Sequence, residues 1–523
     1  MRKKIQIWMF VLILMASIVL IPDSPVLANS SSTTTNTSVD SAKIDDHVES
    51  MIKQLQIPGV ALGIVKGDQI VYLKGYGTSG PDGDPITPQT PFVLGSTSKS
   101  FTALSIMQLV EQGKIDLNAP VQQYLPNFKL ADPKAAGAIL VKDLLHQVSG
   151  LSTYEGRRVF NNKFNSIDEL ATHLDDVPLS DPVGSTYHYS NLNYDLLGSI
   201  IQAVSGQSYA EYVQEHIFNP LDMKNSFTSV TEAQRNGLAK GYQSIFGYMI
   251  PMDFPDNPSI LASGYLISSA EDMAHYLTAQ LNNGKYKNVS IASPAIVSTM
   301  HQPYAKDPST GHYYGMGWEI NDNIIQHNGA VENFHSDMIL DGDTAIVVLI
   351  NAQDFLVRGM NFSKIASGVQ QIMKGQEPTG VEIANVTRTY VIIDFICVII
   401  VALIAWSIYN LFKKKKKFTP IPLRITVSLL SLLIFNLIIP VGVLLLMGRM
   451  APWNVVFTYL PGIGHFIFII CILLLGIGAI KTFLLIQNII KYKMKQKNPR
   501  LPESHIRGHE KQQAAPPTPE IRL

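Results

Sequence analysis

Ser96 and Lys99 lie three residues apart in the segment from Gly95 to Ser100, directly before the apolar run from Phe101 to Val110. On a helix this spacing leaves the two side chains roughly 60° apart around the axis and about 4.5 Å apart along it, so they share one face. A serine hydroxyl is a weak nucleophile that needs a neighbouring base, and an amine can be that base when burial lowers its pKa. The spacing therefore predicts a nucleophile paired with a base. The alternative is an ordinary helix N-cap beside a solvated lysine.

Two further short motifs follow in the chain. Tyr189-Ser190-Asn191 comes after a turn-like Pro182-Val183-Gly184, and His327-Asn328-Gly329 ends a predicted strand and is followed by Ala330. Taken alone, Tyr-x-Asn is typical of a turn with a packed ring, and a histidine at a strand end is usually structural.

The order Ser-x-x-Lys, Tyr-x-Asn and then a basic residue-x-Gly resembles the serine β-lactamases and penicillin-binding DD-peptidases. More narrowly, it is similar to the class C β-lactamase group, which also contains esterases and D-amino-acid peptidases. The similarity covers residues 42–375. It includes the segments 101–104, 142–146, 149–151, 264–268 and 314–318.

This resemblance implies an α+β fold with an antiparallel sheet flanked by helices and an all-helical subdomain beside it. The site would lie at their junction. Ser96 would be the acylated nucleophile, and Lys99 would deprotonate it, alone or together with Tyr189. Tyr189 would return a proton to the leaving group and help to activate the deacylating water.

The resemblance also implies a substrate-binding set. Asn191 would hold a substrate amide oxygen and the lysine, His327 and Gly329 would line the pocket, and the N–H of Ala330 would join that of Ser96 in an oxyanion hole. His327 stands where the family most often has lysine. An imidazole has a reference pKa of about 6.5, so we expect it to be largely neutral at pH 7 and to become charged as the pH falls through about 6 to 7. Efficient β-lactam hydrolysis is therefore disfavoured.

The elements that must position these residues follow from periodicity. The sequence predicts a helix over 44–55, a hairpin of 60–65 with 69–76, late strands at 316–320, 324–327, 334–340 and 344–351, and a helix over 355–373. Strands at both ends of a helical middle predict one sheet built from both ends of the domain.

Composition excludes several function classes. Lysine plus arginine and aspartate plus glutamate both number 41, so net charge gives no argument for nucleic-acid binding. The two cysteines, Cys397 and Cys471, lie in apolar runs, and no metal-type spacing of cysteine or histidine is present. We therefore expect neither a metal nor a cofactor.

The flanking regions predict a membrane protein. Residues 1–28 are typical of a signal peptide, with an uncleaved anchor as the alternative, and residues 29–41 of a flexible linker. After a linker at 376–389, the region 390–490 contains three apolar segments, 390–412, 425–447 and 463–480, and residues 491–523 form a polar tail. Lysines cluster at 413–417 and beyond the third segment, which predicts a cytoplasmic tail and an extracytoplasmic domain.

The expected function is that of a membrane-anchored serine hydrolase that forms an acyl-enzyme on Ser96. Its substrate would be a cell-wall-related peptide, amide or ester, or another small acyl compound. The alternatives are a penicillin-binding sensor that holds its acyl group, a true β-lactamase, and a transporter carrying a hydrolase-like domain. The transporter alternative is weak because few polar residues lie in the apolar segments. Asp394 and His465, near the predicted outer ends, are expected to reach the membrane interface.

Overall fold

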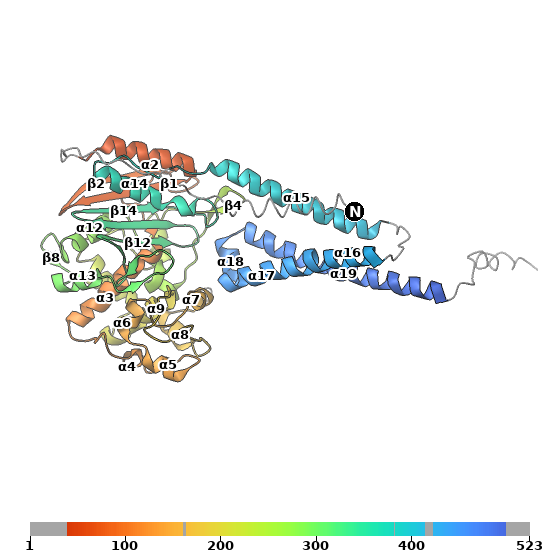
Figure 1. The fold of residues 1–523 in the computed structure, drawn as a ribbon. Coiled ribbons are helices and arrows are strands. Elements are labelled where there is room, and N and C mark those ends of the chain that lie inside the picture. The colour runs from red at the N-terminus through yellow and green to blue at the C-terminus, as the bar shows by residue number, and fades with distance from the viewer. Residues whose placement is uncertain (1–38, 161–163, 381, 414–421, 498–523) are drawn as a thin grey trace, which may run out of the picture. The chain divides into compact units, whose positions relative to one another are not determined.

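The structure is a computed structural model that describes residues 39–160, 164–380, 382–413 and 422–497 (Figure 1). The predicted signal peptide, most of the first linker, lysines 414–417 and the tail beyond residue 497 lie outside the described residues. The predictions made for those segments rest on the sequence alone.

An eight-stranded antiparallel sheet organises the region before residue 380, in the order β2-β1-β14-β13-β12-β11-β10-β9. Two strands come from the start of the domain and six from its end, which confirms the predicted sheet. The strand bounds are β1 Gly59–Lys66, β2 Gln69–Gly77, β9 Ala305–Lys306, β10 Tyr313–Tyr314, β11 Glu319–Asn321, β12 Ile324–Ala330, β13 His335–Asp341 and β14 Thr344–Ile350. β12 runs three residues further than predicted and so carries the whole His327 motif.

The central strands β1 and β14 are buried on both faces, which explains their continuous apolar sequences. Side chains alternate between faces along a strand. Ala61 and Val347 belong to the larger hydrophobic core, whereas Leu62 and Val348 belong to a second core on the opposite face. Leu62 pairs directly with Val348 in the sheet register. One sheet therefore separates two cores.

Helices cover both faces of this sheet and form a helical region beside it (Figure 1). Helices α2 (Ser41–Leu55) and α14 (Ser363–Met373) pack on the second core, and α12 (Ala270–Leu281) packs on the larger core. Helix α3 (Ser98–Glu111) is buried on nearly all sides. The remaining helices of the domain are α4 Val121–Tyr124, α5 Pro133–Ala138, α6 Val141–Leu145, α7 Thr153–Phe160, α8 Ile167–Thr172, α9 Asn191–Ser205, α10 Tyr209–Val213, α11 Val230–Arg235 and α13 Pro294–Met300.

Short strands complete the domain outside the main sheet. They form three small groups: β4 Gly241–Ile245, β5 Tyr248–Met252 and β15 Ala352–Gln353; β3 Phe92–Val93 with β6 Ile267–Ser268; and β7 Lys285–Tyr286 with β8 Val289–Ser290. The second of these groups pairs Phe92–Val93, just before the Ser96 motif, with Ile267–Ser268, at the end of the 264–268 landmark.

The last helix of the domain starts later than its sequence predicts. The expected helix spans 355–373, but α14 begins at Ser363. The Asp354 carboxylate accepts hydrogen bonds from the backbone N–H groups of Leu356 (2.9 Å) and Val357 (3.1 Å), which fixes a turn there. A local side-chain turn therefore replaces the first helical turns.

In the described part of the chain after residue 385, three helical segments are long and apolar enough to cross a membrane: Val386–Phe412, Ile425–Met450 and Ile463–Met494. All three are longer than the predicted segments. The first is α15, and the second consists of α16 (Pro422–Leu433), a π-helical turn (Ile434–Ile438) and α17 (Ile439–Met450). The short helix α18 (Trp453–Tyr459) precedes α19 (Ile463–Lys497). These are candidate membrane helices by length and composition.

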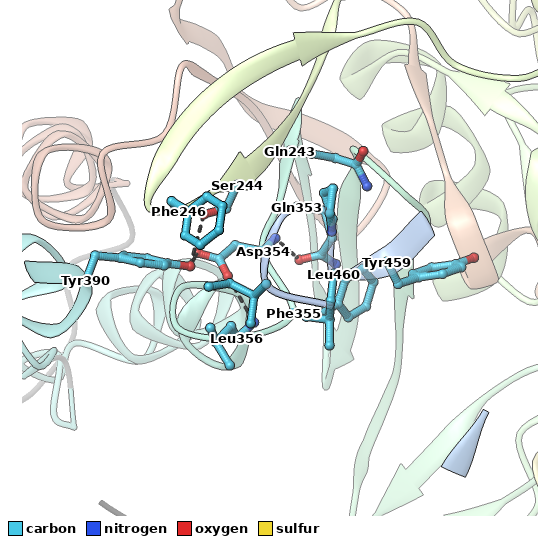
Figure 2. A pocket seen from close by; sticks show the side chains of 12 residues that line it. Gln243, Ser244, Phe246, Gln353, Asp354, Phe355, Leu356, Tyr390, Tyr459 and Leu460 are labelled. Carbon is cyan, nitrogen blue, oxygen red and sulfur yellow. Dashed lines mark hydrogen bonds between the residues drawn. The ribbon is translucent and has the colours of Figure 1, made fainter. Parts of the chain in front are cut away.

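A small cavity lies where the start of α15 meets a buried ion pair, and Asp354 of that pair and Tyr390 of α15 are among the residues that line it (Figure 2). Arg358 Nη1 lies 2.9 Å from Asp354 Oδ2, and both side chains are 1% exposed. The Tyr390 hydroxyl of α15 donates to the same carboxylate oxygen at 2.8 Å and accepts from Ser244 Oγ at 2.9 Å. None of the side chains predicted to form the Ser96 site lines this cavity.

Candidate active site

Ser96 lies in a single 3₁₀ turn, Gly95–Thr97, that leads into α3. Lys99 follows in the first turn of α3, and its Nζ donates a hydrogen bond to Ser96 Oγ at 3.0 Å. No side chain caps either helix start. The alternative interpretation of an N-cap beside a solvated lysine is therefore wrong, since Lys99 is also 0% exposed.

Lys99 has three acceptors for the three N–H bonds of an ammonium group. Besides Ser96 Oγ, they are Asn191 Oδ1 at 2.8 Å and the backbone carbonyl of Ser263 at 2.6 Å. Burial lowers the pKa of Lys99 and so favours the neutral amine. Carbonyl oxygens can only accept, whereas a hydroxyl can turn and donate. When Lys99 is neutral, its lone pair is therefore directed to Ser96, and the two carbonyl groups hold its remaining N–H bonds.

Tyr189 closes the other side of the lysine. Its ring centroid lies 4.9 Å from Lys99 Nζ, within cation–π range. Its hydroxyl is near Ser96 but lacks the geometry of a formed hydrogen bond. Burial raises the pKa of Tyr189 well above its usual value, partly opposed by the nearby Ser96 hydroxyl. Tyr189 therefore keeps its proton at neutral pH.

Backbone groups of β12 lie directly against Ser96, and glycines permit this approach. Gly95 has φ +61°, and a Cβ there would lie 2.6 Å from the Ala330 nitrogen. A Cβ at Gly329 would lie 2.0 Å from the Leu94 carbonyl oxygen and 2.9 Å from the Ser96 nitrogen. The N–H groups of Ser96 and Ala330 are thus brought close together, as an oxyanion hole requires.

His327 is buried in the site and stays neutral through the pH range in which we expected it to become charged. It is 2% exposed, its Nδ1 lies 2.6 Å from the Asn328 carbonyl oxygen, and its Nε2 lies 3.2 Å from the Tyr314 hydroxyl. A carbonyl can only accept, so Nδ1 carries the proton and neutral Nε2 accepts from Tyr314. Burial, and next the charge of Lys99, lower the pKa of His327 to about 3. The expectation that His327 becomes charged between pH 6 and 7 is therefore wrong.

The structure brings all seven predicted side chains and backbone groups together, and it adds a carboxyl group that the sequence interpretation missed. Asp195 follows Asn191 by one turn of α9 and is 1% exposed. Burial raises its pKa, and the charge of Lys99 opposes that rise. A signal was present, because Asp195 is the one charged residue in the sequence of the helix Asn191–Ser205.

A second buried acid was also missed. Glu332 follows Ala330 by two residues, is 6% exposed, and accepts from the Tyr265 hydroxyl at 3.0 and 3.2 Å through its two oxygens. Burial raises the pKa of Glu332 to about 7. No pattern in the sequence distinguishes this glutamate from an exposed one.

Comparison with known proteins agrees with this geometry. The model of the beta-lactamase family matches residues 44–363. Protein flp of Staphylococcus aureus (strain MW2) is 33% identical over 318 residues, which cover 59% of this chain and 62% of flp, so more than a third of flp lies outside the match. The unguisins hydrolase ungD' of Aspergillus campestris is 27% identical over 332 residues, covering 58% of this chain and 60% of that protein.

Solved structures show the same fold. The octameric penicillin-binding protein homologue from Pyrococcus abyssi superposes with a TM-score of 0.58 at 30% identity, covering 65% of this chain and 79% of that one. FmtA from Staphylococcus aureus superposes with a TM-score of 0.53 at 23% identity, covering 67% and 96%, and shares the fold. Because the family match spans more than half of the chain, and a Ser–Lys pair lies at its site, the protein belongs to the beta-lactamase family of serine hydrolases.

Proposed function

We propose that this protein is a membrane-anchored hydrolase that works outside the cytoplasmic membrane and forms an acyl-enzyme on Ser96. The observation that carries the proposal is the 3.0 Å hydrogen bond between Lys99 Nζ and Ser96 Oγ, with the lysine fully buried and its other two N–H bonds held by carbonyl groups. Such a lysine can lose its proton near neutral pH and then act as a general base.

Acylation follows from these positions. Neutral Lys99 takes the hydroxyl proton of Ser96 as Oγ attacks the substrate carbonyl carbon. The N–H groups of Ser96 and Ala330 stabilise the oxyanion that develops. Collapse of this intermediate breaks the bond to the leaving group, which needs a proton. Tyr189 supplies it and regains one from the Lys99 ammonium, so the proton taken from Ser96 leaves with the product.

The pKa shifts support Lys99 alone, and not Lys99 together with Tyr189, as the base. A tyrosine with a raised pKa is a poor base but keeps a proton to donate, whereas a lysine with a lowered pKa is the better base. We therefore assign proton abstraction to Lys99 and proton donation to Tyr189. In deacylation the direction reverses, and a water replaces the leaving group.

The substrate class is narrowed by His327. A neutral imidazole offers no positive charge to a substrate carboxylate, because its pKa is about 3. This supports an amide or ester substrate whose acyl part lacks a carboxylate next to the pocket, and it counts against a β-lactamase. The related ungD' is named as a hydrolase of unguisins, which supports hydrolysis as the activity of this chain.

Covalent labelling tests the proposal. Detergent-solubilised full-length protein should react with a fluorescent fluorophosphonate, and Ser96→Ala should abolish labelling. Ser100→Ala is the matched control, because Ser100 lies four residues further, in α3, and its hydroxyl donates to the Thr97 carbonyl at 2.9 Å. Lys99→Met should slow labelling by about 10² to 10⁴-fold. Labelling that survives Ser96→Ala would remove the catalytic assignment.

Turnover separates the hydrolase from the penicillin-binding sensor and from the β-lactamase. A hydrolase releases p-nitrophenol from simple acyl esters continuously, whereas a sensor gives a single burst that is equal to the amount of enzyme. Rapid hydrolysis of nitrocefin, a β-lactam, together with slow ester turnover would instead support a β-lactamase.

The proposed orientation rests on charge. Lysine residues cluster between the first two apolar helices and at the C-terminal end of the third, and positive charge near a span favours the cytoplasmic side. Lys224, whose side chain is 78% exposed on the hydrolase domain, and Leu523 at the chain end are suitable positions for cysteine. A membrane-impermeant maleimide applied to intact cells should label Lys224→Cys and not Leu523→Cys. The opposite pattern would invert the orientation.

A further inference from the structure

Asp195 and Lys99 lie on two sides of one residue, Ser263. Ser263 belongs to the π-helical turn Leu261–Tyr265, which packs between α3 and α9. Its carbonyl oxygen accepts from Lys99 Nζ at 2.6 Å, and its hydroxyl donates to the Ile260 carbonyl at 3.3 Å. Ser263 also lies close enough to Asp195 to lower the pKa of that carboxyl, against the effect of burial. One residue therefore lies close to both the amine and the acid. Asp195 is one turn after Asn191 on α9, and Asn191 Oδ1 accepts from Lys99 Nζ at 2.8 Å, so the acid lies on the face of α9 that is turned to the lysine.

The environment of Asp195 is costly for an acid that only supports the fold. The side chain is 1% exposed, and within the described part of the chain its Oδ1 has no hydrogen-bond partner. A buried carboxyl with an unpaired oxygen destabilises a protein, and such groups are concentrated at functional sites. An apolar residue of similar size would be the better choice for packing alone.

We propose that Asp195 is a positioning residue that, through its charge and through Ser263, makes Lys99 and Asp195 one titrating pair and thereby sets the pH at which the Ser96 base becomes active. This inference rests on the proposed role of Lys99 as the base. An ionised Asp195 holds the Lys99 ammonium, and a protonated Asp195 releases the lysine from that attraction.

The other titratable groups around the pair do not replace Asp195 in this role. They are Tyr189, Tyr194, Tyr209, His327 and, beyond Tyr189, Glu319. Burial raises the pKa of each tyrosine, and it lowers that of His327 to about 3, so these four stay neutral at working pH. Burial also raises the pKa of Glu319, to about 7. Asp195 is the carboxyl whose charge acts on Lys99.

The consequence is a defined change in pH dependence. Without the carboxylate, nothing offsets the effect of burial on Lys99, so its pKa falls further. The neutral amine then persists to lower pH. In a plot of the Ser96 labelling rate against pH, the acidic limb is the range in which the rate falls because Lys99 becomes protonated. In a variant without the Asp195 charge, this limb should move to lower pH by about one unit.

The test measures the second-order rate of fluorophosphonate labelling from pH 5 to 9 on detergent-solubilised full-length protein. Asp195→Asn keeps the shape and removes the charge, so its acidic limb should lie about one unit lower, with labelling at pH 5.5 faster than in the unmodified protein by up to 10-fold. Ser263→Ala keeps the carbonyl that binds Lys99 but loses the hydroxyl, one of the nearby groups that lower the pKa of Asp195. It should move the limb in the same direction by a smaller amount.

Asp272→Asn is the matched control. Asp272 is also 1% exposed with its pKa raised by burial, but its partners are Ser226 and the Asn225 N–H. This change should leave the limb in place even if it lowers stability. If Ser96→Ala abolishes labelling while Asp195→Asn and Ser263→Ala leave the limb unmoved, the inference fails and the proposed function stands. If Ser96→Ala keeps its label, the proposed function itself fails. If Asp195→Asn does not fold, the position of the acidic limb in Ser263→Ala decides whether the inference holds.

Discussion

Replacing Glu332 by glutamine should stabilise the protein at alkaline pH and not at acidic pH. The carboxyl is 6% exposed, and the Tyr265 hydroxyl donates to it. Glutamine has the same shape and still accepts from Tyr265 through its amide oxygen, but it never ionises. The substitution therefore isolates the effect of charging this buried acid.

The pKa of Glu332 gives the magnitude. It rises from 4.5 to about 7 in the folded protein because burial disfavours the charge. Below about pH 4.5 the acid is neutral whether the chain is folded or not, so its ionisation has no effect on stability. As the pH rises to about 7, the unfolded chain loses this proton first, and folding becomes less favourable. At about 1.4 kcal/mol for each pH unit, the loss is about 3 kcal/mol above pH 7, and Glu332→Gln removes it.

Thermal unfolding of the detergent-solubilised protein, followed by tryptophan fluorescence, measures this effect. For a domain of this size, about 3 kcal/mol corresponds to a rise in Tm of roughly 5 °C at pH 8 relative to the unmodified protein, and little change at pH 5. Glu377→Gln is the control, because this carboxylate is 82% exposed in its pair with Lys43. The same change in Tm at pH 5 and pH 8 would refute the assignment of a charge penalty to Glu332.

Three further outcomes follow from contacts in the structure. His327→Gln should leave the pH profile of Ser96 labelling unchanged between pH 5 and 8, because one neutral side chain replaces another; a moved limb would show that the imidazole titrates there. Gly329→Ala should reduce labelling by at least about 10²-fold with the fold retained by circular dichroism, because its Cβ would meet the Leu94 carbonyl at 2.0 Å; normal labelling would contradict the described backbone approach. Arg358→Met should lower the free energy of unfolding by about 3 to 5 kcal/mol, since it leaves Asp354 buried without its partner, and adding Asp354→Asn should recover part of that loss; no recovery would mean that the pair is not coupled.

The sheet and the Ser96 helix could be predicted because their signals are local. Strands buried on both faces give continuous apolar runs, and a helix buried all round gives an apolar segment without a polar face, as in α3. The three apolar helices after residue 385 were equally clear by length. The start of α14 could not be predicted, because the turn at Asp354 depends on a single side chain in a segment that could also be helical.

The electrostatics of the site could not be predicted, because they depend on burial by distant segments. Lys99 is held by the carbonyl of Ser263, which lies 164 residues further along the chain, and any residue has such a carbonyl. The neutral state of His327 depends on its full burial and on the charge of Lys99. Sequence showed which residue types meet at the site, whereas only the packed structure shows which of them carry charge.

The pairing of β1 with β14 has a consequence for how the protein is made. Val60 pairs with Ile350, so the sheet joins residues 290 positions apart, and contacts of this separation form slowly. Until β14 has been synthesised, the β1–β2 hairpin has one unpaired edge along β1. An unpaired strand edge is a template for association with another chain. Helix α15 starts at Val386, only 36 residues after that last pairing residue. The last strand of the sheet and the first apolar helix are therefore synthesised almost together. A delay in the pairing of β14 with β1 would leave the open edge of β1 exposed to neighbouring chains.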